Sequence, residues 1–86
     1  MLQPRILEVK PMDKYNIRLE YETGEIKIFD VSPYIEGDWF GELSNETYFK
    51  TVRLVPGGIG IEWLNGQDIA PHELYDLSNH KFKFEG

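Results

Sequence analysis

Two carboxylates that flank a short turn form the most suggestive chemical arrangement in this 86-residue chain. Asn65-Gly66 is a strong hairpin signal, and a hairpin there sets Glu62 opposite Asp68. Paired carboxylates act as general acid and base when a concave pocket shifts their pKa values. We therefore take Glu62, Trp63, Asn65 and Asp68 as candidate binding residues. In the structural alternative, Trp63 fills the core and Asp68 accepts backbone N–H groups near the following helix.

The other catalytic and metal-binding patterns are incomplete. His72 and His80 are the only histidines, and their spacing is not the i, i+4 pair that places two ligands on one helix face. The chain has no cysteine, so thiolate zinc sites and cysteine nucleophiles are excluded. Residues 57–60 are rich in glycine but lack the lysine and hydroxyl of a phosphate-binding loop. We predict no catalytic residue, no metal and no cofactor, and therefore a protein that is not an enzyme.

Two adjacent aromatic residues are further candidates for binding. Trp39 and Phe40 lie between Asp38 and Glu42, in a segment that lacks the period-two alternation of a strand. Large rings of this kind either close one end of a small core or remain exposed as the anchor for a partner protein. The sequence leaves both interpretations open.

The charge distribution bears on the class of partner. The chain has nine basic and fifteen acidic residues, a formal net charge of −6. Between positions 20 and 46 the only basic residue is Lys27, and the acids are Glu20, Glu22, Glu25, Asp30, Glu36, Asp38, Glu42 and Glu46. Such a surface is poorly suited to nucleic acid but attracts a basic protein, although net charge also serves solubility. We predict a small basic protein partner and no direct nucleic-acid binding.

Targeting signals are absent from the pattern. No apolar run approaches the roughly 20 residues of a membrane helix, and the first ten residues do not resemble a signal peptide. We predict a soluble, cytoplasmic protein without a membrane partner.

Periodicity predicts an α+β fold in one domain over residues 1–86. We expect an antiparallel sheet of about five short strands with two or three short helices. The segments with strand character are Arg5–Lys10, Tyr15–Glu22, Ile26–Asp30, Val52–Val55, Ile59–Trp63 and Asp68–Ala70. The helical segments are Asp38–Leu43, a helix capped by Ser44 or Asn45 that runs through Val52, and Pro71–Leu77.

The first hairpin permits a prediction of register. Pairing Tyr21 with Ile26 and Leu19 with Ile28 places all four apolar side chains on one face and sets Glu20 opposite Lys27. A loop one residue longer sets Leu19 against Lys27. The pattern therefore favours a loop of two or four residues.

The order of the motifs resembles a bacterial family, domain of unknown function 2442, over residues 5–77. The resemblance rests on Val9-Lys10-Pro11, Tyr15–Leu19, Glu22–Glu25, Phe29–Pro33, Phe49–Val52, Ile61–Pro71 and Leu74-Tyr75. It implies a small α+β protein without established activity, of a kind often encoded beside another small protein. The leading hypothesis is therefore an interaction module, antitoxin-like, that partners such a neighbour. The alternative is a small-ligand-binding or enzymatic domain with its site around the Asn65-Gly66 hairpin.

The C-terminal tail, residues 78–86, lies beyond that resemblance. Lys81, Phe82, Lys83 and Phe84 alternate strictly, so an extended chain places both phenylalanines on one side. We predict that the tail adds as a strand to a sheet edge, either of the same chain or of a second copy in a homo-oligomer. A frayed terminus is the alternative.

Overall fold

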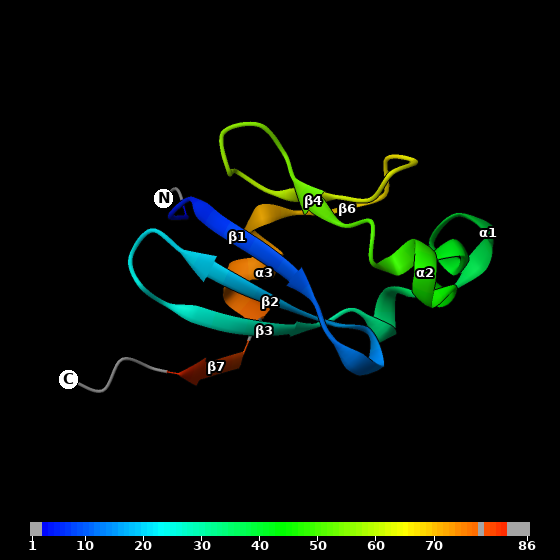
Figure 1. Cartoon of the computed structure of the whole chain (residues 1–86), viewed down its shortest axis with the longest axis horizontal. Helices are drawn as coiled ribbons and strands as arrows, with labels where there is room; N and C mark the ends of the chain where they lie inside the picture. The colour runs from blue at the N-terminus through cyan, green and yellow to red at the C-terminus, as the bar shows by residue number, and fades with distance from the viewer. Residues whose placement is uncertain (1–2, 78, 83–86) are drawn as a thin grey trace.

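The strands form two antiparallel sheets (Figure 1). The structure is a computed structural model that describes residues 3–77 and 79–82, the last four as backbone. The larger sheet has the order β1-β2-β3-β7, with bounds Ile6–Pro11, Asn16–Tyr21, Ile26–Asp30 and Asn79–Phe82. The smaller sheet has the order β4-β5-β6, with bounds Arg53–Leu54, Ile61–Glu62 and Asp68–Ile69. The helix α3 (Pro71–Leu77) lies against one face of the larger sheet.

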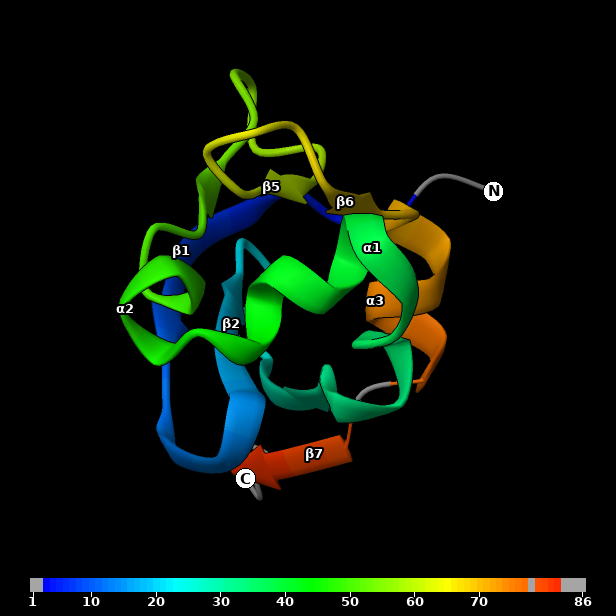
Figure 2. The same cartoon turned by 90° about the vertical axis from the view of Figure 1, so that its right-hand side faces the viewer.

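Short helical turns between β3 and β4 build one end of the molecule, which Figure 2 faces. They are η2 Ser32–Tyr34, α1 Gly37–Phe40, η3 Gly41–Ser44 and α2 Glu46–Phe49; a further turn, η1 Asp13–Tyr15, joins β1 to β2. Asn45 caps α2 as predicted, because its Oδ1 accepts hydrogen bonds from the backbone N–H groups of Thr47 and Tyr48 at 2.9 and 3.2 Å. The helix ends at Phe49 rather than Val52, since the Thr51 hydroxyl donates to the Tyr48 carbonyl and the chain then extends into β4.

The α+β class is confirmed, but the expected count of about five strands in one sheet is wrong. The described residues contain seven strands in two sheets. Three of these strands are only two residues long. Alternation identifies that a segment is extended, but it carries no information about which strands share a sheet. The second sheet therefore could not be read from periodicity.

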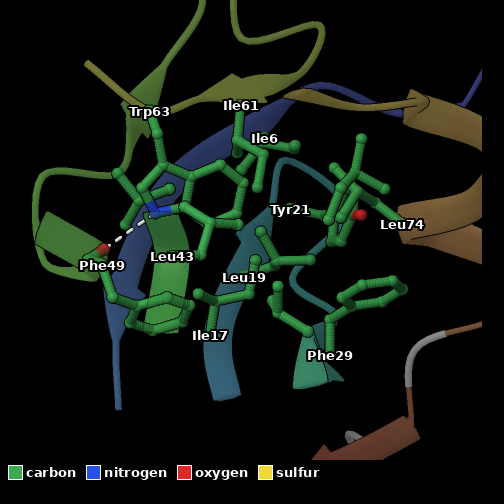
Figure 3. Close-up of a cluster of buried hydrophobic side chains, with 13 residues drawn as sticks. Ile6, Ile17, Leu19, Tyr21, Phe29, Leu43, Phe49, Ile61, Trp63 and Leu74 are labelled. Carbon is green, nitrogen blue, oxygen red and sulfur yellow. Dashed lines mark hydrogen bonds between the residues drawn. The ribbon is translucent and has the colours of Figure 1, made fainter. Parts of the chain in front are cut away.

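Trp63 is the largest of the fully buried side chains in the core (Figure 3). It is fully buried, and its indole Nε1 donates to the Phe49 carbonyl at 2.8 Å, so its one polar atom is satisfied. The other buried residues of the core come from both sheets, the helical turns and α3: Ile6, Ile17, Leu19, Tyr21, Phe29, Val31, Leu43, Phe49, Val52, Ile61, Ile69 and Leu74. Tyr15 packs against this core and is partly buried. The structural role expected for Trp63 is thus present.

The predicted register of the β2–β3 hairpin is wrong by one residue. Leu19 pairs with Lys27, and Glu20 pairs with Ile26. Lys27 consequently shares the core face with Leu19 and is only 4% exposed, whereas Ile26 is half-buried on the opposite face. Both phases of β3 contain apolar residues, Ile26 and Ile28 in one and Phe29 in the other, so alternation did not distinguish them. In the observed register Lys27 donates a hydrogen bond to the Tyr75 carbonyl of α3.

The tail forms an edge strand of the same chain. β7 pairs antiparallel with β3, with Ile28 opposite Asn79 and Ile26 opposite Phe82. The prediction of strand addition is thereby confirmed for residues 79–82, while Lys83 and Phe84 lie outside the described residues. Within the described part of the chain, no helix is long and apolar enough to cross a membrane.

Candidate functional site

The hairpin that carries four of the predicted site residues forms as expected. β5 and β6 pair with Glu62 opposite Asp68. The turn closes when the Trp63 N–H donates to the Gln67 carbonyl at 2.8 Å and the Gly66 N–H donates to the Trp63 carbonyl at 2.9 Å. Gly66 has a φ of +103°, a conformation that L side chains rarely adopt, which explains glycine at this turn position.

A polar network joins this hairpin to the helical end of the molecule. The Asn65 amide donates to both carboxylate oxygens of Glu42 at 2.9 Å. The Gln67 amide, which is fully buried, donates at 2.9 Å to Glu42 and to the Trp39 carbonyl. Tyr48 donates to Gln67 Oε1 at 2.7 Å and accepts from the Asn65 backbone N–H at 2.7 Å. Every polar atom of the buried Gln67 side chain therefore has a partner within the chain.

The network changes the acidity of Glu42. Hydrogen bonds from Asn65 and Gln67 lower the pKa of the Glu42 carboxyl, because they stabilise its charged form, and partial desolvation opposes them. Glu42 is exposed at the surface. Its negative charge is thereby maintained to lower pH than in an ordinary glutamate.

The structure does not gather the six predicted site residues into one site. Trp39 and Asn65 are joined through Gln67 and Glu42, and the Trp39 ring lies beside Gly66, 3.9 Å from where a Cβ would stand. Phe40 packs partly buried against the core, and Trp63 is inside it. Glu62 instead faces Arg53, whose Nε donates to it at 3.1 Å.

Asp68 departs from the structural role that the sequence suggested. It is exposed, and among the described residues its carboxylate accepts no hydrogen bond. The first backbone N–H groups of α3 that find a partner, those of Glu73 and Leu74, donate instead to the Ala70 carbonyl, at 3.0 and 3.1 Å. The Ala70 carbonyl, and not the Asp68 side chain, thus accepts these hydrogen bonds at the start of α3.

Sequence reasoning missed Gln67 and Tyr48 as partners of the hairpin. A buried glutamine has no distinctive sequence signal, since only its surroundings show that its amide is enclosed. Tyr48 lies within the segment predicted to be a helix, where no local signal indicates the partners of its hydroxyl. Glu42 was noted only as one of the acids near Trp39 and Phe40. These residues come from segments about 20 positions apart in the chain, and tertiary contacts bring them together.

The two adjacent aromatic residues have different environments. Phe40 closes the core, whereas Trp39 is 53% exposed on α1. The segment around Trp39, residues 36–46, carries Glu36, Asp38, Glu42 and Glu46 and no basic residue; we call it the acidic helical end. The next cation along the chain is Lys50, after α2. The core interpretation thus holds for Phe40, whereas Trp39 is exposed and its role as a partner anchor stays a prediction.

The cavities on the surface of the described residues include three that none of the six predicted site residues lines. One of about 340 Å³ is lined by Phe29, Asp30, Pro33, Tyr34 and Leu77. One of about 500 Å³ is lined by Gln3, Pro4, Arg5, Glu22, Ile59 and Pro71. A third, of about 50 Å³, adjoins η1 and α2. In the described part of the chain, no group of three or more His, Asp or Glu side chains is placed to hold a metal ion.

Comparison with known proteins gives one match. No curated protein and no solved structure shows significant similarity to the chain. A family model described as "Protein of unknown function (DUF2442)" matches residues 6–80, close to the range 5–77 over which the motifs resemble that family. This match covers β1 through the first residues of β7 and includes both sheets. The chain therefore belongs to the DUF2442 family.

Proposed function

We propose that this protein is a non-enzymatic interaction module that binds a small basic protein through its acidic helical end, as an antitoxin binds its partner. The observation that carries the proposal is Trp39, 53% exposed in a segment whose charges are all negative. Exposed tryptophan is costly to leave in water and is enriched among the residues that dominate protein–protein binding energy.

The contacts that hold Trp39 in place support this role. Its carbonyl accepts a hydrogen bond from the fully buried Gln67, and its ring lies beside the glycine of the β5–β6 turn. The backbone at Trp39 is thereby held by a buried polar network rather than by a free loop. An anchor that is already positioned loses less conformational entropy on binding, which favours affinity.

The charge of the surrounding surface supports a basic partner. Over residues 28–49 the chain has five acids and no lysine or arginine: Asp30, Glu36, Asp38, Glu42 and Glu46. Negative potential of this kind accelerates encounter with a positively charged protein, and the effect declines as salt screens it. The polar rim and the apolar Trp39 together have the composition of a small interface.

A two-variant binding experiment tests the proposal. The protein is first used to capture its partner at physiological salt, and the purified complex is then measured by calorimetry. Trp39→Ala should weaken binding more than tenfold, the effect expected of a hot spot. Ile59→Ala is the matched control, because Ile59 is also a large exposed apolar residue, 61% exposed, but lies in the β4–β5 connection. It should change affinity less than twofold.

Three results would contradict the proposal or its electrostatic part. One is recovery of background proteins alone in the capture step. Another is an Ile59→Ala effect equal to that of Trp39→Ala, which would place the interface elsewhere. Binding that increases with salt would also contradict the electrostatic part of the argument.

The alternative of a ligand or catalytic site around Asn65-Gly66 has less support. The amides of Asn65 and Gln67 and the hydroxyl of Tyr48 bond to one another and to Glu42, which leaves few polar groups to recognise a ligand. A thermal-shift screen of metabolites and metals distinguishes the two functions. A stabilising ligand whose effect disappears in Asn65→Ala would favour the alternative.

A further inference from the structure

A second feature of the surface has the composition of a cation site. The cavity of about 340 Å³ lies where the end of β3 and η2 face the last residue of α3. Tyr34 supplies a partly exposed aromatic ring, the buried Phe29 packs behind it with the two ring centroids 5.6 Å apart, and Pro33 and Leu77 add apolar walls. Ligand sites typically have volumes of roughly 300–1,000 Å³, so this one suits a single extended side chain.

Among the side chains that the structure describes, Asp30 is the one charged group that lines this cavity. Asp30 Oδ1 accepts hydrogen bonds from the Ser32 N–H and hydroxyl at 2.9 and 2.7 Å. Its second oxygen, Oδ2, has no hydrogen-bond partner among the described residues. Burial, together with the negative charge of the nearby Glu73, raises the pKa of the Tyr34 hydroxyl. No lysine or arginine is among the described residues that line the cavity.

Aromatic faces and a carboxylate in one cavity recognise a cation on an apolar stem. The rings attract the positive charge through their quadrupoles, the carboxylate pairs with it, and the apolar walls contact the methylene groups. An anion would be repelled by Asp30, and a purely apolar group would leave the free Asp30 oxygen desolvated and unpaired. The lining therefore favours a lysine or arginine side chain over either.

We propose that the Phe29–Tyr34–Asp30 cavity receives a lysine or arginine side chain of the basic partner. The identity of the occupant rests on the proposed function, but the chemistry of the cavity does not. The proposal adds a second anchor point, separate in sequence from Trp39, at which the partner must present a cation. It also predicts that specificity depends on the position of one basic side chain, not on net charge alone.

Small probes test the cavity without the partner. The full chain is titrated with N-acetyl-lysine N-methylamide and, separately, with its neutral counterpart N-acetyl-norleucine N-methylamide, and binding is followed by NMR. The lysine probe should shift the side-chain resonances of Phe29, Tyr34 and Leu77. It should bind at least about fivefold more tightly than the norleucine probe, and the difference should shrink with added salt.

Substitutions at the rim provide the controls. Asp30→Asn removes the charge but keeps an oxygen for Ser32, so the turn should persist while lysine-probe affinity falls about fivefold. Asp13→Asn makes the same charge change at an exposed residue outside this cavity and should leave affinity unchanged. Leu77→Lys places a cation at the rim and should abolish lysine binding, whereas Leu77→Gln should not. Leu77 is 61% exposed, so neither change disturbs the core.

The outcomes separate this inference from the proposed function. Equal binding of the two probes would show an apolar crevice only and would overturn the cation site. Shifts confined to residues around Trp39 would overturn it as well. Neither result would contradict the proposed function, which the capture experiment with Trp39→Ala tests separately. Conversely, a failed capture together with a positive probe titration would retain the cation site and reject the protein partner.

Discussion

The ammonium group of Lys27 lies 3.5 Å from the centre of the Tyr75 ring and donates a hydrogen bond to the Tyr75 carbonyl oxygen. Tyr75 is in the last turn of α3, where carbonyl groups lack intrahelical partners and the helix dipole favours a cation. The rest of the Lys27 side chain lies on the core-facing side of β3 and is buried. One side chain thus joins the helix to the sheet across 48 residues of sequence.

Substitutions of Lys27 should separate its apolar stem from its charge. Lys27→Ala removes the buried stem, the cation–π contact and the carbonyl's donor, and should lower the free energy of unfolding by about 3 kcal/mol. Lys27→Met keeps the stem and removes a charge that is costly to bury, so it should remain within about 1 kcal/mol of the wild type. Urea denaturation at pH 7 measures both. Equal losses for the two variants would show that the hydrogen bond, rather than the stem, stabilises this contact.

The burial of Lys27 also determines how the free energies of unfolding of the wild type and Lys27→Met compare as pH changes. Burial lowers the pKa of Lys27, and Glu25 and Asp76 only partly oppose it. Between the lowered pKa and the ordinary value of 10.5, the unfolded chain binds more protons than the folded one. The wild type should therefore gain stability relative to Lys27→Met as pH rises through that window.

Tyr21 carries an unsatisfied polar atom. Its hydroxyl is buried without a hydrogen-bond partner among the described residues. Tyr21→Phe should therefore increase the free energy of unfolding at pH 7 by about 1 kcal/mol. Burial, reinforced by Tyr75 and Glu25, also raises the pKa of Tyr21 above 10.0, so the wild type loses stability as pH rises above 10 and the unfolded tyrosine ionises. The advantage of Tyr21→Phe should grow in that range; a destabilised variant would reveal a partner for the hydroxyl.

Two neighbouring glycines should respond differently to substitution. Gly57 and Gly58 have φ values of +91° and +71°, so alanine is strained at both. At Gly58 a Cβ would also stand 2.5 Å from the Ile6 carbonyl oxygen, whereas at Gly57 nothing lies within 4 Å. Gly57→Ala should lower the free energy of unfolding by about 1 kcal/mol and Gly58→Ala by about 3 kcal/mol or more. Thermal melting of the pair checks this, and similar losses would contradict the close approach of this loop to β1.

Replacing Gln67 should lower the free energy of unfolding, because three groups of the polar network bond to its side chain. Gln67→Leu leaves the Trp39 carbonyl, Glu42 and the Tyr48 hydroxyl without their buried partner, and should cost about 2–3 kcal/mol of unfolding free energy. The measurement is chemical denaturation at pH 7. A neutral effect would mean that water replaces the amide at little cost.

Acid stability should report on Glu42. Because its folded pKa is lowered below 4.5, its charge stabilises the fold above that pH, and the contribution is lost as pH falls through the folded pKa. Glu42→Gln should therefore flatten the pH dependence of the melting temperature below pH 5. Glu36→Gln, an exposed acid outside the network, is the control and should leave the profile unchanged.

Truncation tests the tail. A chain ending at residue 78 lacks β7, so β3 becomes an edge strand and loses its second set of backbone hydrogen bonds. We expect a lower melting temperature. Sedimentation of both chains shows at the same time whether a second copy pairs with the outer edge of β7 in a homo-oligomer. An unchanged melting temperature and mass would indicate that the tail contributes nothing to the fold.

Local signals predicted much of the secondary structure. The alternation of Tyr15–Tyr21 identified β2 and its buried face, because that strand is apolar in one phase only. Pro71 at the first position and the following pattern predicted α3 with its bounds, and Asn65-Gly66 predicted the β5–β6 turn. Asn45 was one of two candidate caps, with Ser44, and its side chain bonds within its own helix. Each of these depends on residues a few positions apart.

Tertiary structure decided the features that depend on distant partners. Both phases of β3 contain apolar residues, so the sequence pattern predicted the wrong inward face. Lys27 faces inward because the ring and the carbonyl of Tyr75, 48 positions away, interact with its charge. Gln67 likewise is a buried network residue only because Trp39, Glu42 and Tyr48 fold around it. Desolvation makes a polar group depend on its complete surroundings, and those surroundings exist only once the chain has closed.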